Sequence, residues 1–180
     1  MTDSLLGYLA FAGIVLCNQN PYLPGLDDIG CTWADTVALI GRRQLFYCKA
    51  FHGRTTYLSV RAYFLLKRCK ERKPLTPNAA QIHELIGQLG IVDMDMLKQV
   101  TGLSSKAVND AIGLLLASLY ITAYENGRTI SENWSTFRYA TAERWEAEAE
   151  APPIGEHPEA ELRELLSATM AEKEIDRFLT

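Results

Sequence analysis

Basic side chains gather in one segment of the chain, residues 41–73, where they alternate with aromatic rings. Ten Lys and Arg residues lie in this basic segment with a single acid, Glu71. Cations bind the phosphates of a nucleic-acid backbone, and neighbouring rings offer stacking surfaces for unpaired bases. The cations that the pattern assigns to such contacts are Arg42, Arg43, Lys49, Arg54, Lys67 and Arg68. The interleaved rings are Phe46, Tyr47, Phe51, Tyr57 and Tyr63. If these rings alternate into a core instead, the cations are ordinary surface charges.

The opposite charge collects at the other end of the chain, whose formal net charge is −4. Residues 146–180 hold ten acids against three Lys and Arg residues. The basic segment indicates an anionic partner, and an acidic tail of this kind could compete with that partner. The two segments could equally be solvated surfaces of opposite sign that touch each other.

A second set of candidate binding residues lies in the stretch GLSSKAVNDAIGLLLASLYIT, residues 102–122. Its apolar positions 108, 112, 115, 116 and 119 follow a period of about 3.6 residues, which predicts a helix capped by Ser104. In the first turns of a DNA-reading helix, Asn can pair with adenine, and Ser and Lys can hold phosphates. The residues assigned to these contacts are Ser104, Ser105, Lys106 and Asn109, with Arg128 on the hairpin that follows.

The elements around this second set are predicted from changes in the hydrophobic period. Thr76 followed by Pro77 marks a helix start, and the period changes to that of a strand at Tyr120. The prediction is helices near 77–89, 93–100 and 104–118, a strand near 120–124, a turn at Asn126-Gly127 and a returning strand from Trp134 that ends at Arg144-Trp145. Three helices followed by a hairpin are the winged-helix arrangement, whose middle pair is a helix-turn-helix.

The elements that must position the basic segment are a hairpin and its flanking helices. The expected order is a buried helix over 4–16, a helix over 32–41, strands near 44–51 and 54–60 around His52-Gly53, and a basic helix. The predicted fold class is mainly α with β-hairpins (α+β), with two winged-helix-like halves. The predicted division is 1–73, 74–146 and 147–180.

The last of these segments begins as an acidic linker and continues as a predicted amphipathic helix from Pro158. Its apolar face would comprise Leu162, Leu165, Leu166 and Met170, and Ile175 and Phe178 would extend it. Such a face must be buried on its own chain or on a partner. A homodimer formed through this helix is therefore one predicted assembly.

Several classes of site and location are disfavoured by the sequence. Four cysteines without C-x-x-C spacing and three scattered histidines predict no metal, and no nucleotide or hydrolase motif indicates a cofactor or a catalytic residue. The apolar run near the N-terminus, LLGYLAFAGIVLC, is too short to span a bilayer, so no membrane partner is expected. Reduced thiols and the lack of a secretory signal predict a cytoplasmic protein.

Roughly residues 30–146 contain the stretch RRQLFYCKAFHGRTTYLSVRAYFLLKR, the predicted helix-turn-helix and hairpin, and the stretch TFRYATAERW. Together, these features resemble the short relatives of the AlkZ-like family. That family contains DNA glycosylases that unhook interstrand crosslinks, built from tandem winged-helix domains and a β-barrel. The resemblance implies winged-helix folds and a connection to nucleic acids. It brings no catalytic residue, because no Gln in this chain is followed two positions later by Gln or Asp, as the pair in the glycosylases requires.

Three functions follow as hypotheses. The first is a non-enzymatic winged-helix protein that binds duplex or single-stranded DNA in regulation or repair. The second is a protein-interaction module that uses the second half, where seven acids face five bases over residues 74–145, together with the C-terminal helix. The third is a divergent DNA glycosylase. A continuous positive surface from the basic segment to Lys106 and Arg128 would favour the first, a broken one the second, and a deep polar cleft the third.

Overall fold

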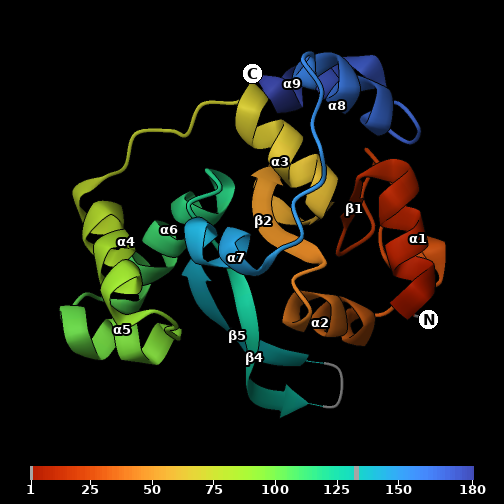
Figure 1. Ribbon diagram of the computed structural model, residues 1–180. Helices are drawn as coiled ribbons and strands as arrows, with labels where there is room; N and C mark the ends of the chain where they lie inside the picture. Colours follow the sequence, from red (N-terminus) through yellow and green to blue (C-terminus); the bar gives the residue numbers. More distant parts are fainter. Residues whose placement is uncertain (1, 132–133) are drawn as a thin grey trace.

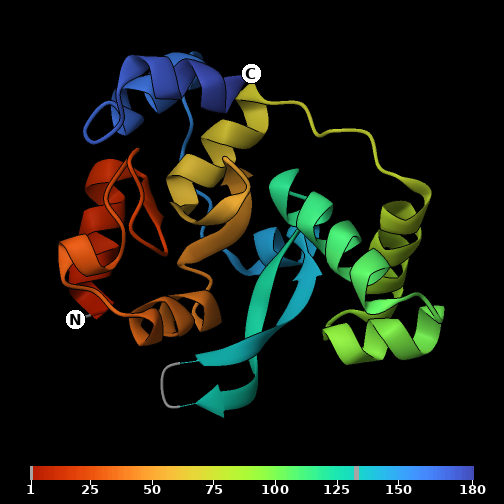
Figure 2. The same cartoon turned by 180° about the vertical axis from the view of Figure 1, so that it is seen from behind.

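Helices surround two small antiparallel sheets in the computed structural model, which describes residues 2–131 and 134–180 (Figure 1). A three-stranded sheet belongs to the N-terminal half, and a two-stranded hairpin belongs to the C-terminal half. The hairpin projects from the molecule on the side opposite the two C-terminal helices, as both views show (Figures 1 and 2). The mixed content of helices and antiparallel strands confirms the predicted α+β class.

The N-terminal half contains the predicted hairpin and helices, with one additional strand. Its elements are α1 (Thr2–Ala12), β1 (Ile14–Leu16), the short 3-10 helix η1 (Asp27–Ile29), α2 (Trp33–Gly41), β2 (Leu45–Phe51), β3 (Arg54–Ser59) and α3 (Val60–Cys69). The predicted helix over 4–16 is wrong at its end, because Gly13 adopts a φ of 75° and residues 14–16 pair with β3 as a strand. A continuous apolar run fits a buried strand as well as a helix, and the β-branched Ile14 and Val15 favour the strand.

The second half contains the three predicted helices at the predicted places. Its elements are α4 (Pro77–Leu89), α5 (Met94–Thr101), α6 (Ser105–Ala117), β4 (Ile121–Ser131), β5 (Trp134–Thr141) and α7 (Ala142–Glu148). The Thr76 hydroxyl accepts a hydrogen bond from the Ala79 N–H, and the Ser104 hydroxyl accepts one from the Ala107 N–H. Both helix starts are therefore fixed by side-chain caps, as the sequence predicted.

The predicted turn at Asn126-Gly127 is wrong, since β4 continues through both residues to Ser131 and pairs Asn126 with Phe137 of β5. Gly127 does not have the positive φ that such a turn requires. A Cβ at Gly127 would lie 2.5 Å from the Thr136 Oγ1 and 2.9 Å from the Thr136 carbonyl oxygen. The glycine therefore permits the close approach of β5, and the connection between the strands lies outside the described residues.

The returning strand also ends earlier than predicted. β5 stops at Thr141, whose hydroxyl accepts a hydrogen bond from the Arg144 N–H and caps α7. Arg144 and Trp145 therefore lie on a helix and not at the end of a strand. Aromatic and β-branched residues continue to Tyr139, so the sequence contains no strand breaker before that point. The Thr141 cap sets the place where the strand ends and α7 begins.

The C-terminal segment forms two helices where one was predicted, α8 (Pro158–Leu166) and α9 (Glu172–Leu179). The apolar residues Leu162, Leu166, Met170, Ile175 and Phe178 are each at most 4% exposed, and α8 packs on α3 (Figure 1). The amphipathic face is therefore buried on its own chain, which removes the reason for a homodimer through it. Among the described residues, no helix has the length and apolar character needed to cross a membrane.

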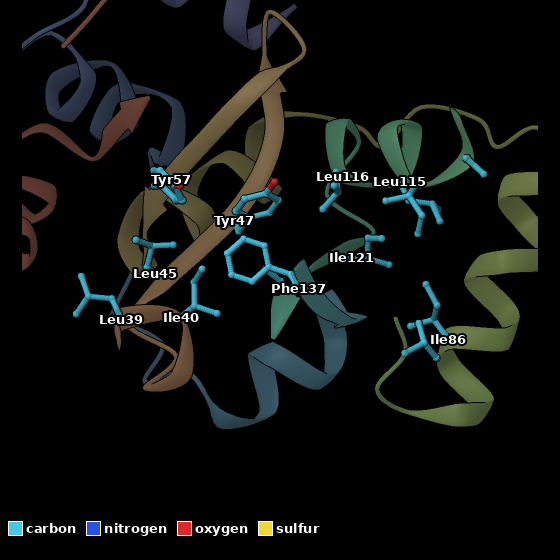
Figure 3. Close-up of a cluster of buried hydrophobic side chains, with 14 of the residues drawn as sticks. Leu39, Ile40, Leu45, Tyr47, Tyr57, Ile86, Leu115, Leu116, Ile121 and Phe137 are labelled. Atoms are coloured by element: carbon cyan, nitrogen blue, oxygen red, sulfur yellow. The ribbon is translucent and has the colours of Figure 1, made fainter. Parts of the chain in front are cut away.

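The hydrophobic core contains residues from both sides of residue 73, the predicted boundary between the halves. One cluster joins Leu39 and Tyr47 of the first half to Leu115 and Phe137 of the second, and Figure 3 shows the Tyr47 and Phe137 rings facing each other. The Thr122 hydroxyl accepts a hydrogen bond from the Tyr47 N–H and donates one to the Tyr47 carbonyl oxygen. A second cluster likewise contains residues of both halves, although an extended linker joins α3 to α4 (Figures 1 and 2).

Candidate nucleic-acid interface

The aromatic rings of the basic segment belong to the core. Their exposure ranges from 0% for Phe46 and Tyr63 to 7% for Tyr47. Phe46 stacks on Tyr63 with the ring centres 3.9 Å apart, and Tyr47 meets Phe137 with the ring centres 5.2 Å apart. The rings therefore point into the core. This fits the second interpretation of the pattern, and the rings offer no stacking surface for bases.

Several cations of the basic segment are paired with carboxylates from α7 and α8. These ion pairs are Arg43–Glu148 at 3.0 Å, Arg61–Glu161 at 3.1 Å, Lys67–Glu146 at 2.7 Å and Arg72–Glu143 at 2.7 Å. The basic and acidic segments thus touch each other. Each pair brings a negative charge beside a cation that would otherwise face a phosphate, so the positive surface is interrupted along α7 and α8.

Arg43 is the most enclosed of these cations, with 11% of its side chain exposed. Its guanidinium donates to the carbonyl oxygens of Ile40, Gly41 and Tyr124 at 2.9, 3.2 and 2.7 Å. It also lies 3.3 Å above the centre of the Tyr124 ring and pairs with Glu148. Arg43 therefore ties the end of α2 to β4 and α7, and its Nε and Nη1 donors are occupied within the protein.

Replacing Arg43 by Ala is expected to lower the free energy of unfolding by about 2–3 kcal/mol, because three carbonyl groups lose a charged donor at one site. For a chain of this size, the expected fall in melting temperature is roughly 5–10 °C. The neighbouring Arg42→Ala is the control, since Arg42 is exposed and forms no ion pair within the described residues. Thermal unfolding followed by circular dichroism measures both variants, and equal melting temperatures would contradict this role.

Other cations line a concave site at the tip of the β2–β3 hairpin. This basic cleft has a volume of about 440 Å³ and is bounded by the hairpin, the C-terminal ends of α3 and α6, and α9. Its cationic lining residues are Lys49, Lys70, Lys73 and Arg177. Phe51 and Phe178 form its apolar wall with ring centres 5.6 Å apart, and His52 and Thr180 also line it. No lining residue has an acidic side chain.

The charges of the basic cleft are only partly compensated. Arg177 pairs with Glu174 at 2.9 Å, whereas Lys49, Lys70 and Lys73 have no carboxylate within 4.0 Å in the described part of the chain. The Lys70 ammonium donates to the Phe178 carbonyl oxygen at 2.6 Å. Burial and the positive charge of nearby Lys73 lower the pKa of Lys70. Two like charges therefore repel each other here, and a bound anion would relieve that repulsion.

The hairpin tip beside the basic cleft is rigidly built. His52 and Gly53 both adopt positive φ, 51° and 67°, which is the backbone of a tight two-residue hairpin turn. The His52 imidazole stacks on the Tyr22 ring with centres 4.3 Å apart and shares a hydrogen bond of 2.8 Å with Glu174. This hydrogen bond and the charge of Arg177 lower the pKa of Glu174. Arg54 follows the turn and is exposed.

The residues predicted at the start of α6 form a separate place on the surface. Ser104 is occupied as the helix cap, and Lys106 pairs with Asp110 at 2.6 Å. Ser105 and Asn109 are exposed, as is Arg128 on β4. The basic cleft meets the other end of α6 at Ala117, eleven residues beyond Lys106, or about 16 Å along the helix axis. The structure therefore does not join Lys106 to Lys49 in one cleft.

The remaining predicted cations lie away from the basic cleft. Arg42 lines a cavity with Gln44 and Glu150, and Arg68 lines one with Glu156 and Glu159. Of the predicted residues, the basic cleft contains only Lys49, with Arg54 beside it at the hairpin tip. Sequence reasoning missed Arg177, which lies in the acidic tail and reaches the cleft only because α9 folds back onto the hairpin.

Comparison with known proteins gave no match to a family model, a curated protein or a solved structure. The resemblance to the AlkZ-like family therefore stays a prediction that rests on the sequence motifs. Within residues 2–131 and 134–180, no group of three or more His, Cys, Asp and Glu side chains is placed to hold a metal ion.

Proposed function

We propose that this chain is a non-enzymatic DNA-binding protein, built from two winged-helix units, that acts in the regulation or repair of DNA. The order of elements supports the two units. In the second half, Val92 forms a single β-bridge with Tyr139 of β5, so the order is helix, bridging residue, two helices and a hairpin. In the first half, α1, β1, η1, α2, β2 and β3 follow the same order, and β1 likewise pairs with the last strand.

The observation that carries the DNA-binding proposal is the basic cleft, whose three lysines have no carboxylate partner among the described residues. Affinity for nucleic acids depends largely on cations that replace the counterions of phosphates. The cations with carboxylate partners can contribute little, because a phosphate would have to displace a neighbouring negative charge. Lys49 and Lys73 in the cleft and Arg54 at its edge are therefore the cations on which we expect binding to depend.

A protein-interaction function is the second candidate, and one observation favours it. Leu89 at the end of α4 and Val100 on α5 are 48% and 54% exposed, in the half of the chain where acids exceed bases. Exposed apolar side chains of this size are typical of protein contacts when they gather on one surface. We propose no catalytic step for this chain.

The proposed function is tested by titrating labelled duplex and single-stranded DNA with the intact protein at two or more salt concentrations. The triple variant Lys49→Ala, Arg54→Ala, Lys73→Ala should weaken binding to all sequences. It should also flatten the dependence of log K on log salt by roughly 2–3 units, because each neutralised duplex phosphate contributes about 0.9.

A matched triple variant, Arg61→Ala, Lys98→Ala, Arg163→Ala, removes the same formal charge from cations that already have carboxylate partners. Its salt dependence should change by less than about one unit. Failure of the intact protein to bind DNA in low salt would overturn the DNA-binding proposal, as would an unchanged affinity of the first triple variant. Either result would favour the protein-interaction candidate.

A further inference from the structure

We infer that the basic cleft holds a terminal phosphate of a nucleic-acid strand. This inference rests on the proposed function and names the part of DNA that the cleft recognises. It follows from two features of the site, its concave shape and the number of its uncompensated charges.

The size of the basic cleft suits a group that projects from a nucleic-acid strand. Its volume of about 440 Å³ lies in the range of small-ligand sites, about 300–1,000 Å³. A double helix is a convex cylinder, so only a group that projects from it can enter a hollow of this size. A strand end projects further than the backbone phosphates along a duplex do.

The charge of the basic cleft fits a terminal phosphate better than a backbone phosphate. Lys49, Lys70 and Lys73 supply three positive charges, and the Arg177–Glu174 pair is neutral. The C-terminal ends of α3, α6 and α9, at Cys69, Ala117 and Leu179, each offset about half a charge. The cleft keeps a net positive charge, so a phosphate monoester, which carries about −1.5 to −2 at pH 7, gains more from it than a backbone diester with one negative charge.

The wall and mouth of the basic cleft suit the nucleotide that carries this phosphate. Phe51 and Phe178 give the cleft an apolar wall, and the Lys70 ammonium lies 5.6 Å from the centre of the Phe178 ring. At the mouth, the His52 ring is held against Tyr22 and is 29% exposed. A terminal base can pack on this held ring while its phosphate lies among the lysines.

The experiment compares one oligonucleotide sequence in three forms, with a 5′-phosphate, with a 3′-phosphate and with hydroxyl groups at both ends. Fluorescence anisotropy in low salt measures the dissociation constant of each, as single strand and as duplex. We expect at least one phosphorylated form to bind about tenfold more tightly than the hydroxyl form. A terminal phosphate that meets no specific site on the protein should change the affinity of the oligonucleotide by less than about twofold.

The double variant Lys49→Ala, Lys73→Ala should lose this preference, and the paired-cation variant Arg61→Ala, Lys98→Ala should keep it. Both lysines are at least partly exposed, and circular dichroism checks that the variants are folded. Equal affinities for all three forms would overturn the inference while leaving DNA binding intact. A preference that persists in the lysine variant would place the site elsewhere and would also overturn it. If no form binds, the proposed function fails as well.

Discussion

Deletion of residues 152–180 is expected to unfold the protein or to leave it prone to aggregation. The deletion removes α8 and α9, with the five apolar side chains that are buried to at least 96% in the described structure. Burial of each such side chain contributes about 1.5–3 kcal/mol, so the sum is on the order of 10 kcal/mol. That sum is comparable to the whole stability of a typical domain, about 5–15 kcal/mol.

The deletion also uncovers the partners of these side chains on the rest of the molecule. Leu66 and Tyr63 of α3 and Phe51 of β2, which lie in the same cluster, would become part of an exposed apolar surface. Thermal unfolding and size-exclusion chromatography measure the outcome. A truncated protein with unchanged melting temperature and unchanged mass would show that the tail is an independent appendage.

A single substitution tests whether the buried side chains of the tail stabilise the protein, without deleting the whole segment. Leu166→Ala should lower the free energy of unfolding by about 2–4 kcal/mol, because Leu166 of α8 is fully buried where α8 packs on α3. Leu89→Ala is the matched control, since the same atoms are removed from a side chain that is 48% exposed. The control should lower the stability by less than about 0.5 kcal/mol.

Replacement of Trp145 by Ala is expected to lower the free energy of unfolding by about 3–5 kcal/mol. Trp145 on α7 is fully buried and meets Phe46 and Tyr63 edge to face, with ring centres 4.9 and 5.0 Å apart. It therefore joins α7 to both β2 and α3. Its removal leaves a large cavity where the second half of the chain packs on the first. Chemical denaturation measures the loss.

The Trp145→Phe variant tests the origin of that loss. The indole N–H of Trp145 is buried and has no hydrogen-bond partner in the described structure. Phenylalanine removes this unpaired donor while it keeps an aromatic ring, so the cost should stay below about 1.5 kcal/mol. A phenylalanine variant as unstable as the alanine variant would contradict this account.

The local elements of this protein could be predicted from its sequence. Thr76 and Ser104 cap α4 and α6 where the sequence placed them, and His52-Gly53 forms the predicted hairpin turn. Caps, turns and hydrophobic periods act over a few neighbouring residues, so the identities of those residues are sufficient. Asn126-Gly127 has the same turn signal but lies within a strand, because its conformation depends on how closely Thr136 of β5 approaches.

The candidate site was decided by the tertiary structure. Composition showed the basic and acidic segments, and only the fold shows that Glu148 neutralises Arg43 while Lys49 and Lys73 have no carboxylate partner in the described part of the chain. Arg177 joins the basic cleft from 128 positions beyond Lys49 in the sequence. A charge depends on its neighbours in space, because electrostatic interactions decrease with distance and screening limits them to about 10 Å. Packing of α9 against the hairpin sets those distances, and sequence spacing carries no information about them.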